Sequence, residues 1–390
     1  MKLRKAQIAA VTILATLPLL GISCKFVPQK AQEAVKPITL KYWRVFDDAD
    51  TLAPVIANYR VAHPNISIEY RKLRSEEYER ELIQAFAEDR GPDILSIHAS
   101  SIRRFQPLLA PLPPQLTVGR IEIRGTLKKE AVPVVETKPS LTLRQLQTNF
   151  VDVVHSDVVI PVKSDDPAQG TVERIYGLPL AVDTLAMFYN RDLLNKAGIA
   201  EPPKTWGEFQ QAAKRLTKLD AQGNVIQAGA AMGTGANVER AADLVALLMM
   251  QNGTQMTDES GAATFNLIPA ALRGRPTPPG EEAIVFYTDF ANPTKEVYTW
   301  NAGMPNSMEA FVTGRSAFFF GYSYHIPTLR ARAPKLDLAI AKIPQIEGNP
   351  ETNYANYWVE TVSKKSAHLN EAWDFIQFAA KADNASKYLA

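Results

Sequence analysis

Short strand-like runs and longer amphipathic stretches follow one another along the first hundred residues. The strand-like runs are alternating or continuously apolar, and between them apolar side chains recur at helical spacing. The pattern predicts strands at 38–43, 66–70 and 92–97 and helices at 51–59 and 75–86. This order of strand and helix is typical of an α/β layer with a mostly parallel sheet.

The stretch 106–175 departs from this order. Its prolines indicate irregular chain, and only 121–124 has the pattern of a short strand. Regular patterning returns as extended segments at 176–183 and 185–190 and as helices at 191–198, 206–216, 241–251, 281–290, 307–312 and 370–380. Thr205 and Glu208 have the spacing of a capping box at the start of one of these helices.

The N-terminus has the pattern of a signal sequence. Three basic residues and no acid precede an apolar stretch at 8–20, which is shorter than the about 20 residues of a membrane span. The stretch leads to Gly21-Ile22-Ser23-Cys24, and Cys24 is the only cysteine of the chain. A small residue before a lone cysteine at this place resembles a bacterial lipobox, which implies cleavage after residue 23 and acylation of Cys24. An ordinary buried cysteine near an uncleaved anchor is the alternative.

Composition limits the classes of protein that fit. With 390 residues the chain is long enough for two domains, and its 46% hydrophobic and 22% charged residues are typical of a globular protein. Removal of residues 1–23 takes away three positive charges and no negative one, which changes the formal net charge from +2 to −1. A near-neutral mature protein shows no footprint of nucleic-acid binding. The polar, aperiodic residues 24–36 are expected to form a flexible tether.

Three blocks of sequence carry a family resemblance. The run from Tyr176 reads Y-G-L-P-L-A-V-D-T-L-A-M-F-Y-N-R-D-L-L, followed by K-A-G and E-P-P-K-T-W-G-E-F. It resembles the crossover region of family 1 extracellular solute-binding proteins, which serve ABC transporters that mostly import sugars and oligosaccharides. Glu309–Gly321 resembles the helix-to-strand return of that family, and Val362–Phe378 resembles its late strand and helix. Family members usually continue for some tens of residues, so the second lobe is expected to be incomplete at the C-terminus.

The resemblance implies a two-lobed, periplasmic-binding-protein-like α/β fold of type II, in which each lobe is a mostly parallel sheet flanked by helices. We expect the first lobe to comprise 37–183 and 316–347, with 106–175 as an elaboration, and the second lobe 184–315 and 348–390. The chain is expected to cross between the lobes near 180–186, 313–321 and 345–352. These crossings would act as a hinge that closes on ligand.

Sugars present hydroxyl rims and apolar ring faces, so a sugar site pairs aromatic rings with carboxylates and amides. Several candidate residues follow predicted strands or lie in or next to the segments that resemble the family, and the others are aromatic or amide residues of nearby loops. The candidates are Trp43, Phe46, Asp47, Asp48, His98, Ser100, Asp183, Trp300, Asn301, Tyr322, Tyr324 and Trp358. Some have a structural alternative, since Asp47 and Asp48 also suit a helix start, Ser100 a helix cap and Trp358 a core position. Trp206 and Trp373 are assigned to the packing of the second lobe.

No enzyme signature accompanies these features. The chain lacks G-x-S-x-G and H-E-x-x-H, and its five histidines have no metal-ligand spacing. The family and lipobox resemblances imply a monomeric binding lipoprotein without cofactor or metal, held at the outer face of the cytoplasmic membrane. It would capture a sugar or oligosaccharide and deliver it to an ABC permease with a separate ATPase. Two alternatives remain open: the same fold binding a polyamine or other small solute, and a surface adhesin without transport.

Overall fold

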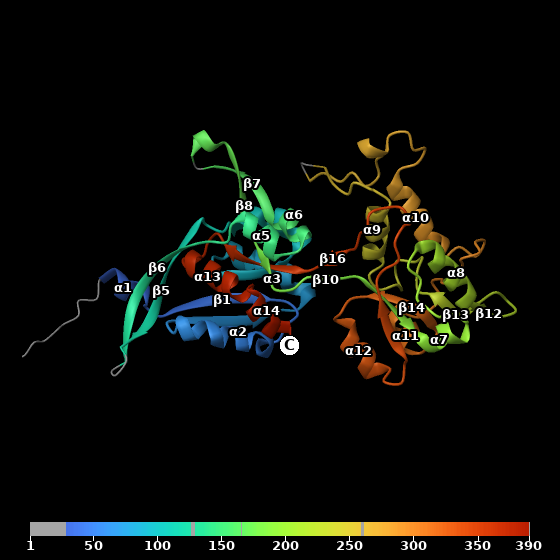
Figure 1. Ribbon diagram of the computed structural model, residues 1–390, viewed down its shortest axis with the longest axis horizontal. Helices are drawn as coiled ribbons and strands as arrows, with labels where there is room; N and C mark the ends of the chain where they lie inside the picture. The colour runs from blue at the N-terminus through green and yellow to red at the C-terminus, as the bar shows by residue number, and fades with distance from the viewer. Residues whose placement is uncertain (1–28, 126–128, 165, 259–260, 390) are drawn as a thin grey trace, which may run out of the picture.

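The computed structural model describes residues 29–125, 129–164, 166–258 and 261–389 and shows two lobes, each built on its own sheet (Figure 1). The expected two-lobed α/β architecture is confirmed. The signal sequence and Cys24 lie outside the described residues.

The sheet of the first lobe has the strand order β2-β1-β3-β17-β4, and β9 also pairs with β17. Its strands are β1 Ile38–Arg44, β2 Ile66–Lys72, β3 Ile94–His98, β4 Leu109–Ala110, β9 Leu178–Pro179 and β17 Trp358–Ser363. The helices of this lobe are α2 Ala49–Ala62, α3 Ser75–Ala87, α4 Ile102–Phe105, α5 Leu143–Asn149, α6 Asp152–Val158, α13 Leu369–Ala379 and α14 Ala382–Leu389.

The sheet of the second lobe has the strand order β12-β13-β14-β11-β15. Its strands are β11 Ala186–Asn190, β12 Lys218–Leu219, β13 Val225–Ala230, β14 Ser316–Gly321 and β15 Leu338–Ala341. Its helices are α7 Arg191–Lys196, α8 Trp206–Leu216, α9 Ala241–Gln251, α10 Pro279–Asp289, α11 Ser307–Val312 and α12 His325–Arg332. The capping box predicted for α8 is present, with Thr205 and Glu208 each bonded to the other's backbone N–H.

The expectation of mostly parallel sheets is wrong. Parallel pairing is limited to β1 with β2 and β3 in the first lobe and to β13 with β14 in the second. The other pairs in these two sheets are antiparallel, including all pairs of β11 and β17. These two strands follow directly on the crossings between the lobes, so no connecting helix sets their direction as in a βαβ unit.

The predicted division of the C-terminal half is also wrong. Residues 316–347 lie in the second lobe, because β14 and β15 both pair with β11. Most of 348–390 lies in the first lobe, because β17 pairs with β3 in the register Trp358↔His98 to Val362↔Ile94. Trp373, assigned to the second lobe from sequence, is therefore fully buried in the core of the first.

Within the described residues, the chain crosses between the lobes at two places. The crossing expected near 180–186 is present as β10 Asp183–Thr184, and the return crossing is β16 Ala355–Asn356. These strands pair antiparallel with each other and lie between the two lobes in Figure 1. The crossings expected at 313–321 and 345–352 are wrong. Strand β14 occupies the first of these ranges, and the second remains in the second lobe, where Asn349 Nδ2 donates to the Gln251 carbonyl oxygen of α9 at 2.8 Å.

Two hairpins form most of the elaboration at 106–175. The longer consists of β5 Gln115–Arg124 and β6 Glu130–Pro139, and the shorter of β7 Val159–Lys163 and β8 Thr171–Ile175. The strand predicted at 121–124 is thus the end of a strand of 10 residues. An isolated two-stranded hairpin is only marginally stable. The stability of the β5–β6 hairpin therefore depends on its packing against the rest of the first lobe.

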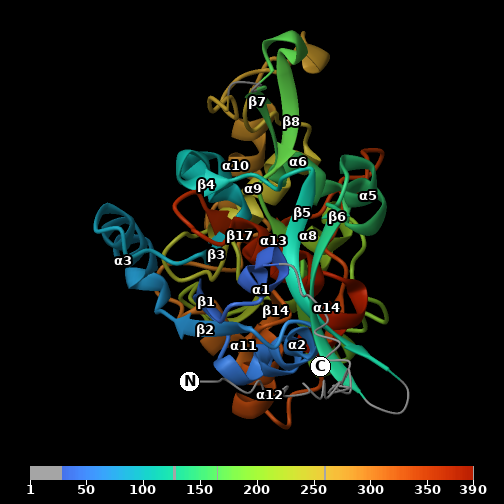
Figure 2. The same ribbon diagram turned by 90° about the vertical axis from the view of Figure 1, so that its left-hand side faces the viewer.

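Part of the expected flexible tether is instead a helix docked on this hairpin. Helix α1, Gln29–Ala34, lies against β5 and β6 (Figure 2). A Cβ on Gly119 of β5 would lie 2.0 Å from the Ala34 carbonyl oxygen. Only glycine therefore permits this close approach of the two backbones.

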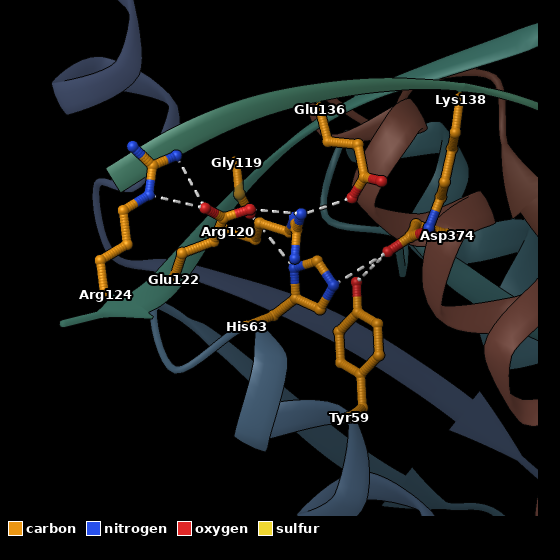
Figure 3. A network of polar contacts seen from close by, with 9 residues as sticks. All are labelled: Tyr59, His63, Gly119, Arg120, Glu122, Arg124, Glu136, Lys138 and Asp374. Carbon is orange, nitrogen blue, oxygen red and sulfur yellow. Dashed lines mark hydrogen bonds and ion pairs between the residues drawn. The ribbon is translucent and has the colours of Figure 1, made fainter. Parts of the chain in front are cut away.

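A buried carboxylate on α13 ties the same hairpin to the rest of the lobe (Figure 3). Asp374 accepts a hydrogen bond from Tyr59 Oη at 3.0 Å and forms an ion pair with Lys138 of β6 at 2.5 Å. His63 lies 3.4 Å from Asp374 through Nε2 and 3.1 Å from the Gly119 carbonyl oxygen through Nδ1. Residues from α2, β5, β6 and α13 thus share one network.

Candidate ligand-binding site

Aromatic side chains gather in the first lobe where β17 leaves the hinge. Trp358, partly exposed, lies two residues beyond the hinge residue Asn356. Its ring makes edge contacts with Phe46 at 5.4 Å and with His98 at 5.9 Å between centroids. Phe46 is 61% exposed. The structure thus brings together three candidates from the ends of β1, β3 and β17, at the surface beside the hinge.

The polar candidates of this lobe differ in their partners. Asp47 is held by Arg44 at 3.1 Å, whereas Asp48 is exposed and pairs with Lys72 at 2.9 Å. Asp48 also occupies the N-cap position of α2, without a side-chain cap hydrogen bond. Ser100 Oγ lies 2.7 Å from His98 Nδ1, so it orients the histidine.

In the second lobe the corresponding surface is centred on the turn after β14. Tyr324 is 53% exposed, and its ring stacks on that of the buried Tyr322 at 5.6 Å. Asp183, on the hinge strand β10, accepts hydrogen bonds from Ser323 N at 3.0 Å and Ser323 Oγ at 2.7 Å. The carboxylate therefore fixes the turn that carries Tyr324.

Three aromatic candidates are core residues instead of surface ones. Trp43 is 5% exposed and faces Arg71, whose guanidinium lies 4.7 Å from its ring centroid. Trp300 is fully buried and donates from Nε1 to Asn237 at 3.1 Å. Tyr322 is likewise fully buried beneath Tyr324. Asn301 Nδ2 donates to Tyr298 Oη at 2.7 Å, so its side chain stabilises the loop to which both residues belong.

Sequence reasoning missed an ion pair at the start of α9. Arg240 Nε donates to Asp243 Oδ2 at 2.7 Å, and Tyr322 Oη donates to the same oxygen at 2.5 Å. The Arg240 guanidinium also lies 5.4 Å from the Tyr322 ring centroid. Arg240 has a left-handed backbone with φ of 58°, which is costly for a residue with a side chain. No motif in the sequence marks this residue, because nothing local favours that conformation.

The hinge residues Asp183 and Asn356 contact the two lobes, one lobe each. Asp183 and Asn356 are Cα partners in the β10–β16 pair. Asn356 Oδ1 lies 2.9 Å from His98 Nε2 in the first lobe, whereas Asp183 binds Ser323 in the second. The single hinge pair thus adjoins both aromatic surfaces.

Burial and hydrogen bonding shift several pKa values here. The hydrogen bond from His325 Nε2 holds the pKa of the Glu239 carboxyl below its ordinary value. Burial raises the pKa of the Tyr322 hydroxyl, helped by the Asp243 carboxylate, so this hydroxyl stays a donor. Burial also raises the pKa of Asp157, against the effect of its hydrogen bond from Tyr357.

The described part of the chain holds no group of three or more histidine, cysteine or acidic side chains placed to bind a metal ion. Among those same residues, none of the helices combines the length and the apolar character that a membrane crossing requires.

The structure thus has two lobes joined by a short pair of crossing strands, with aromatic and polar side chains on both sides of that pair. The family model described as bacterial extracellular solute-binding protein matches residues 47–386. The chain belongs to this family. Its members are binding proteins and not enzymes, which confirms the expectation from sequence.

Known relatives agree with this assignment. A binding protein of Brucella abortus is 25% identical over 55% of this chain and 49% of its own length. The arabinooligosaccharide-binding protein of Bacillus subtilis is 24% identical over 55% of this chain and 47% of its own length. The chain spans about half the length of the curated relatives it matches.

Solved structures share the fold. The cyclic α-maltosyl-1,6-maltose binding protein of Arthrobacter globiformis superposes with a TM-score of 0.65 at 18% identity, over 90% of this chain and 77% of that one. An ABC substrate-binding protein of Listeria monocytogenes in complex with cycloalternan superposes with a TM-score of 0.60 at 16% identity, over 90% and 78% of the two chains.

Proposed function

We propose that the protein captures a sugar or oligosaccharide between its lobes and delivers it to an ABC permease with a separate ATPase. The observation that carries this proposal is the pair of aromatic surfaces flanking one hinge pair, Phe46 with Trp358 on one side and Tyr324 on the other. Exposed rings beside carboxylate and hydroxyl groups suit the apolar faces and hydroxyl rims of a sugar. The names of the relatives, which include binders of arabinooligosaccharides and of cyclic maltosyl-maltose, support the same class of ligand.

The charges at the site favour a neutral ligand over a polyamine. Among the carboxylates Asp47, Asp183 and Asp243, Asp47 is paired with Arg44 and Asp243 with Arg240, so two of these three are compensated within the protein. Asp183 is the third, and it is bonded to Ser323. A polycation needs several uncompensated acids to offset the cost of losing its hydration.

We further propose that Cys24 is acylated and holds a monomeric protein at the outer face of the cytoplasmic membrane. The only cysteine of the chain follows an apolar segment of signal-peptide length. Acyl chains hold a protein on a membrane because each buried CH₂ contributes about 0.8 kcal/mol.

Calorimetric titration of the full chain tests the binding proposal. The panel contains maltotetraose, mannobiose and arabinotriose, with spermidine as the cationic alternative. Binding of one carbohydrate, accompanied by a smaller radius of gyration in solution scattering, is expected because ligand that touches both lobes favours the closed state. Binding of spermidine alone would overturn the assignment to sugars.

Two variants locate the site in the same titration. Trp358→Ala and Tyr324→Ala are expected to weaken carbohydrate binding by about tenfold or more, since each removes a ring from one of the two surfaces. Phe265→Ala is the matched control, because Phe265 is 41% exposed but lies outside both surfaces. Equal losses in all three variants would argue against the hinge as the binding site.

A further inference from the structure

The loop that carries Phe46 and Asp47 is held by a side chain from the far end of the described chain. Tyr388, on α14, donates a hydrogen bond from Oη to Asp47 Oδ2 at 3.1 Å. Arg44 Nη2 joins the pair, at 3.3 Å from Tyr388 Oη and 3.1 Å from Asp47 Oδ2. The three side chains thus form a closed triangle around one carboxylate oxygen.

The triangle is anchored inside the lobe. The Arg44 side chain is 7% exposed, lies 3.4 Å from the buried Glu360 carboxylate of β17, and stacks over the Tyr388 ring at 5.1 Å. The Asp47 backbone is fixed separately, because its carbonyl oxygen accepts a hydrogen bond from Tyr70 Oη at 2.6 Å. Arg44 is held by buried contacts, and Tyr388 is partly buried against the core of the first lobe, so both serve as fixed points for the loop.

The second carboxylate oxygen of Asp47 remains available to a ligand. Among the residues that the structure describes, the side-chain contacts of this carboxylate go to Oδ2, and Oδ1 has no partner. The side chain keeps 23% of its surface exposed. A carboxylate held through one oxygen presents the other in a fixed direction as a hydrogen-bond acceptor.

We propose that Tyr388 is a positioning residue of the ligand site: by holding Asp47 Oδ2 it orients Oδ1 toward a ligand hydroxyl and keeps Phe46 against Trp358. This inference rests on the proposed function. Its physical basis is preorganisation, since a loop fixed before binding loses less conformational freedom when the ligand arrives. Tyr388 itself does not touch the ligand.

A purely structural role gives a different expectation. If the hydroxyl only fastened α14 to the lobe, its loss would lower stability and leave the loop and the affinity unchanged. Tyr59→Phe provides the matched control, because Tyr59 also donates its hydroxyl to a carboxylate of this lobe, at 3.0 Å, but the acceptor is Asp374 in the hairpin network. Tyr388→Phe keeps the ring that lies over Arg44 and removes the hydroxyl alone.

The first measurement uses the full chain without ligand, so it does not depend on the proposed function. Hydrogen exchange of the amides at residues 45–48 is expected to speed up by about tenfold in Tyr388→Phe and to stay unchanged in Tyr59→Phe. Exchange that is the same in Tyr388→Phe as in the parent protein would overturn the inference, whatever the carbohydrate results.

The second measurement is affinity for the carbohydrate that the titration of maltotetraose, mannobiose and arabinotriose selects. Tyr388→Phe is expected to raise Kd about threefold to tenfold, the effect of one hydrogen bond, with no change in Tyr59→Phe. In an Asp47→Asn background the same substitution should raise Kd by less, because its effect passes through Asp47. A freed loop with unchanged Kd would refute the positioning role. A freed loop in a protein that binds none of these sugars would support the hold on the loop and count against the proposed function.

Discussion

Asp183 and Asn356 sit opposite each other in the hinge, and their side chains reach in opposite directions, one to Ser323 of the second lobe and the other to His98 of the first. Each crossing strand is therefore fastened to the surface that would hold the ligand. A rotation of the lobes about this pair must carry the two aromatic surfaces with it, because each is hydrogen-bonded to a hinge residue.

Asp183→Asn tests this coupling. Oδ2 of Asp183 accepts from Ser323 N and Oγ, and Oδ1 accepts from Thr184 N at 2.9 Å. An amide has one oxygen, so it cannot satisfy both sides. We expect carbohydrate affinity to fall about tenfold in calorimetry because the turn bearing Tyr324 loosens.

The control for Asp183→Asn is Asp220→Asn. Asp220 accepts from Gln222 N at 2.9 Å and Asn224 N at 2.8 Å in an exposed turn of the same lobe. Affinity unchanged in both variants would show that the turn does not depend on Asp183.

Glu239→Gln is expected to destabilise the protein in a pH-dependent way. The hydrogen bond from His325 lowers the pKa of Glu239, so its contribution to stability is present above the ordinary glutamate pKa of about 4.3 and is lost as pH falls through the lower folded value. Thermal melts should show a Tm gap of a few °C, about 1 kcal/mol, at pH 7, and the gap should close as the pH falls well below 4.

Glu351→Gln is the matched control for that series, because Glu351 pairs with Lys342 on the surface, where both side chains are exposed. Surface pairs contribute little, so its melts should follow the parent protein at every pH. A Tm gap for Glu239→Gln that is the same at pH 3 and pH 7 would contradict the assignment of the shift to His325.

Individual helices were more predictable from the sequence than the pairing of strands into sheets. Local signals were sufficient for α8, whose capping box of Thr205 and Glu208 lies within four residues of chain. The sheet to which β17 belongs was not predictable, because Trp358–Ser363 has the same strand pattern in either lobe and its partner β3 lies far away in sequence. Pairing between distant strands depends on tertiary packing that no local pattern records.

The candidate site also contains residues that local sequence indicates and residues whose position depends on tertiary packing. Phe46 and His98 were candidates because they follow or end predicted strands, and the structure places both against Trp358, which the sequence left open between site and core. Trp300 is fully buried and Tyr324 is half exposed, a difference that tertiary packing decides and that neither local sequence records. Tyr388 carried no signal, because its role comes from α14 folding back onto the first strand.

Gly119→Ala should displace α1 from the β5–β6 hairpin. The new methyl would lie 2.0 Å from the Ala34 carbonyl oxygen, so one of the two backbones must move. We expect a loss of about 1–3 kcal/mol in urea unfolding and faster hydrogen exchange at residues 31–36. Gly207→Ala, where the nearest atom is 3.9 Å away, should cost nothing measurable. Unchanged exchange in Gly119→Ala would show that α1 does not depend on this contact.

Cys24→Ala tests the proposed anchor. Without the sulfur no acyl chain can be attached, and the protein is expected to leave the membrane fraction when cells are fractionated. Retention of the variant in membranes to the same extent as the parent would rule out acylation as the means of attachment. Because Cys24 is the only cysteine, the variant removes no other thiol.

The position of β17 has a consequence for the order of folding. The second lobe is one continuous stretch of chain between the two hinge strands, whereas the sheet of the first lobe is complete only when β17 inserts between β3 and β4. As the chain emerges from its N-terminus, the edge of β3 stays open until the whole second lobe has emerged, and open edges invite wrong pairing. The lobe that comes first in the sequence is thus the last to be finished.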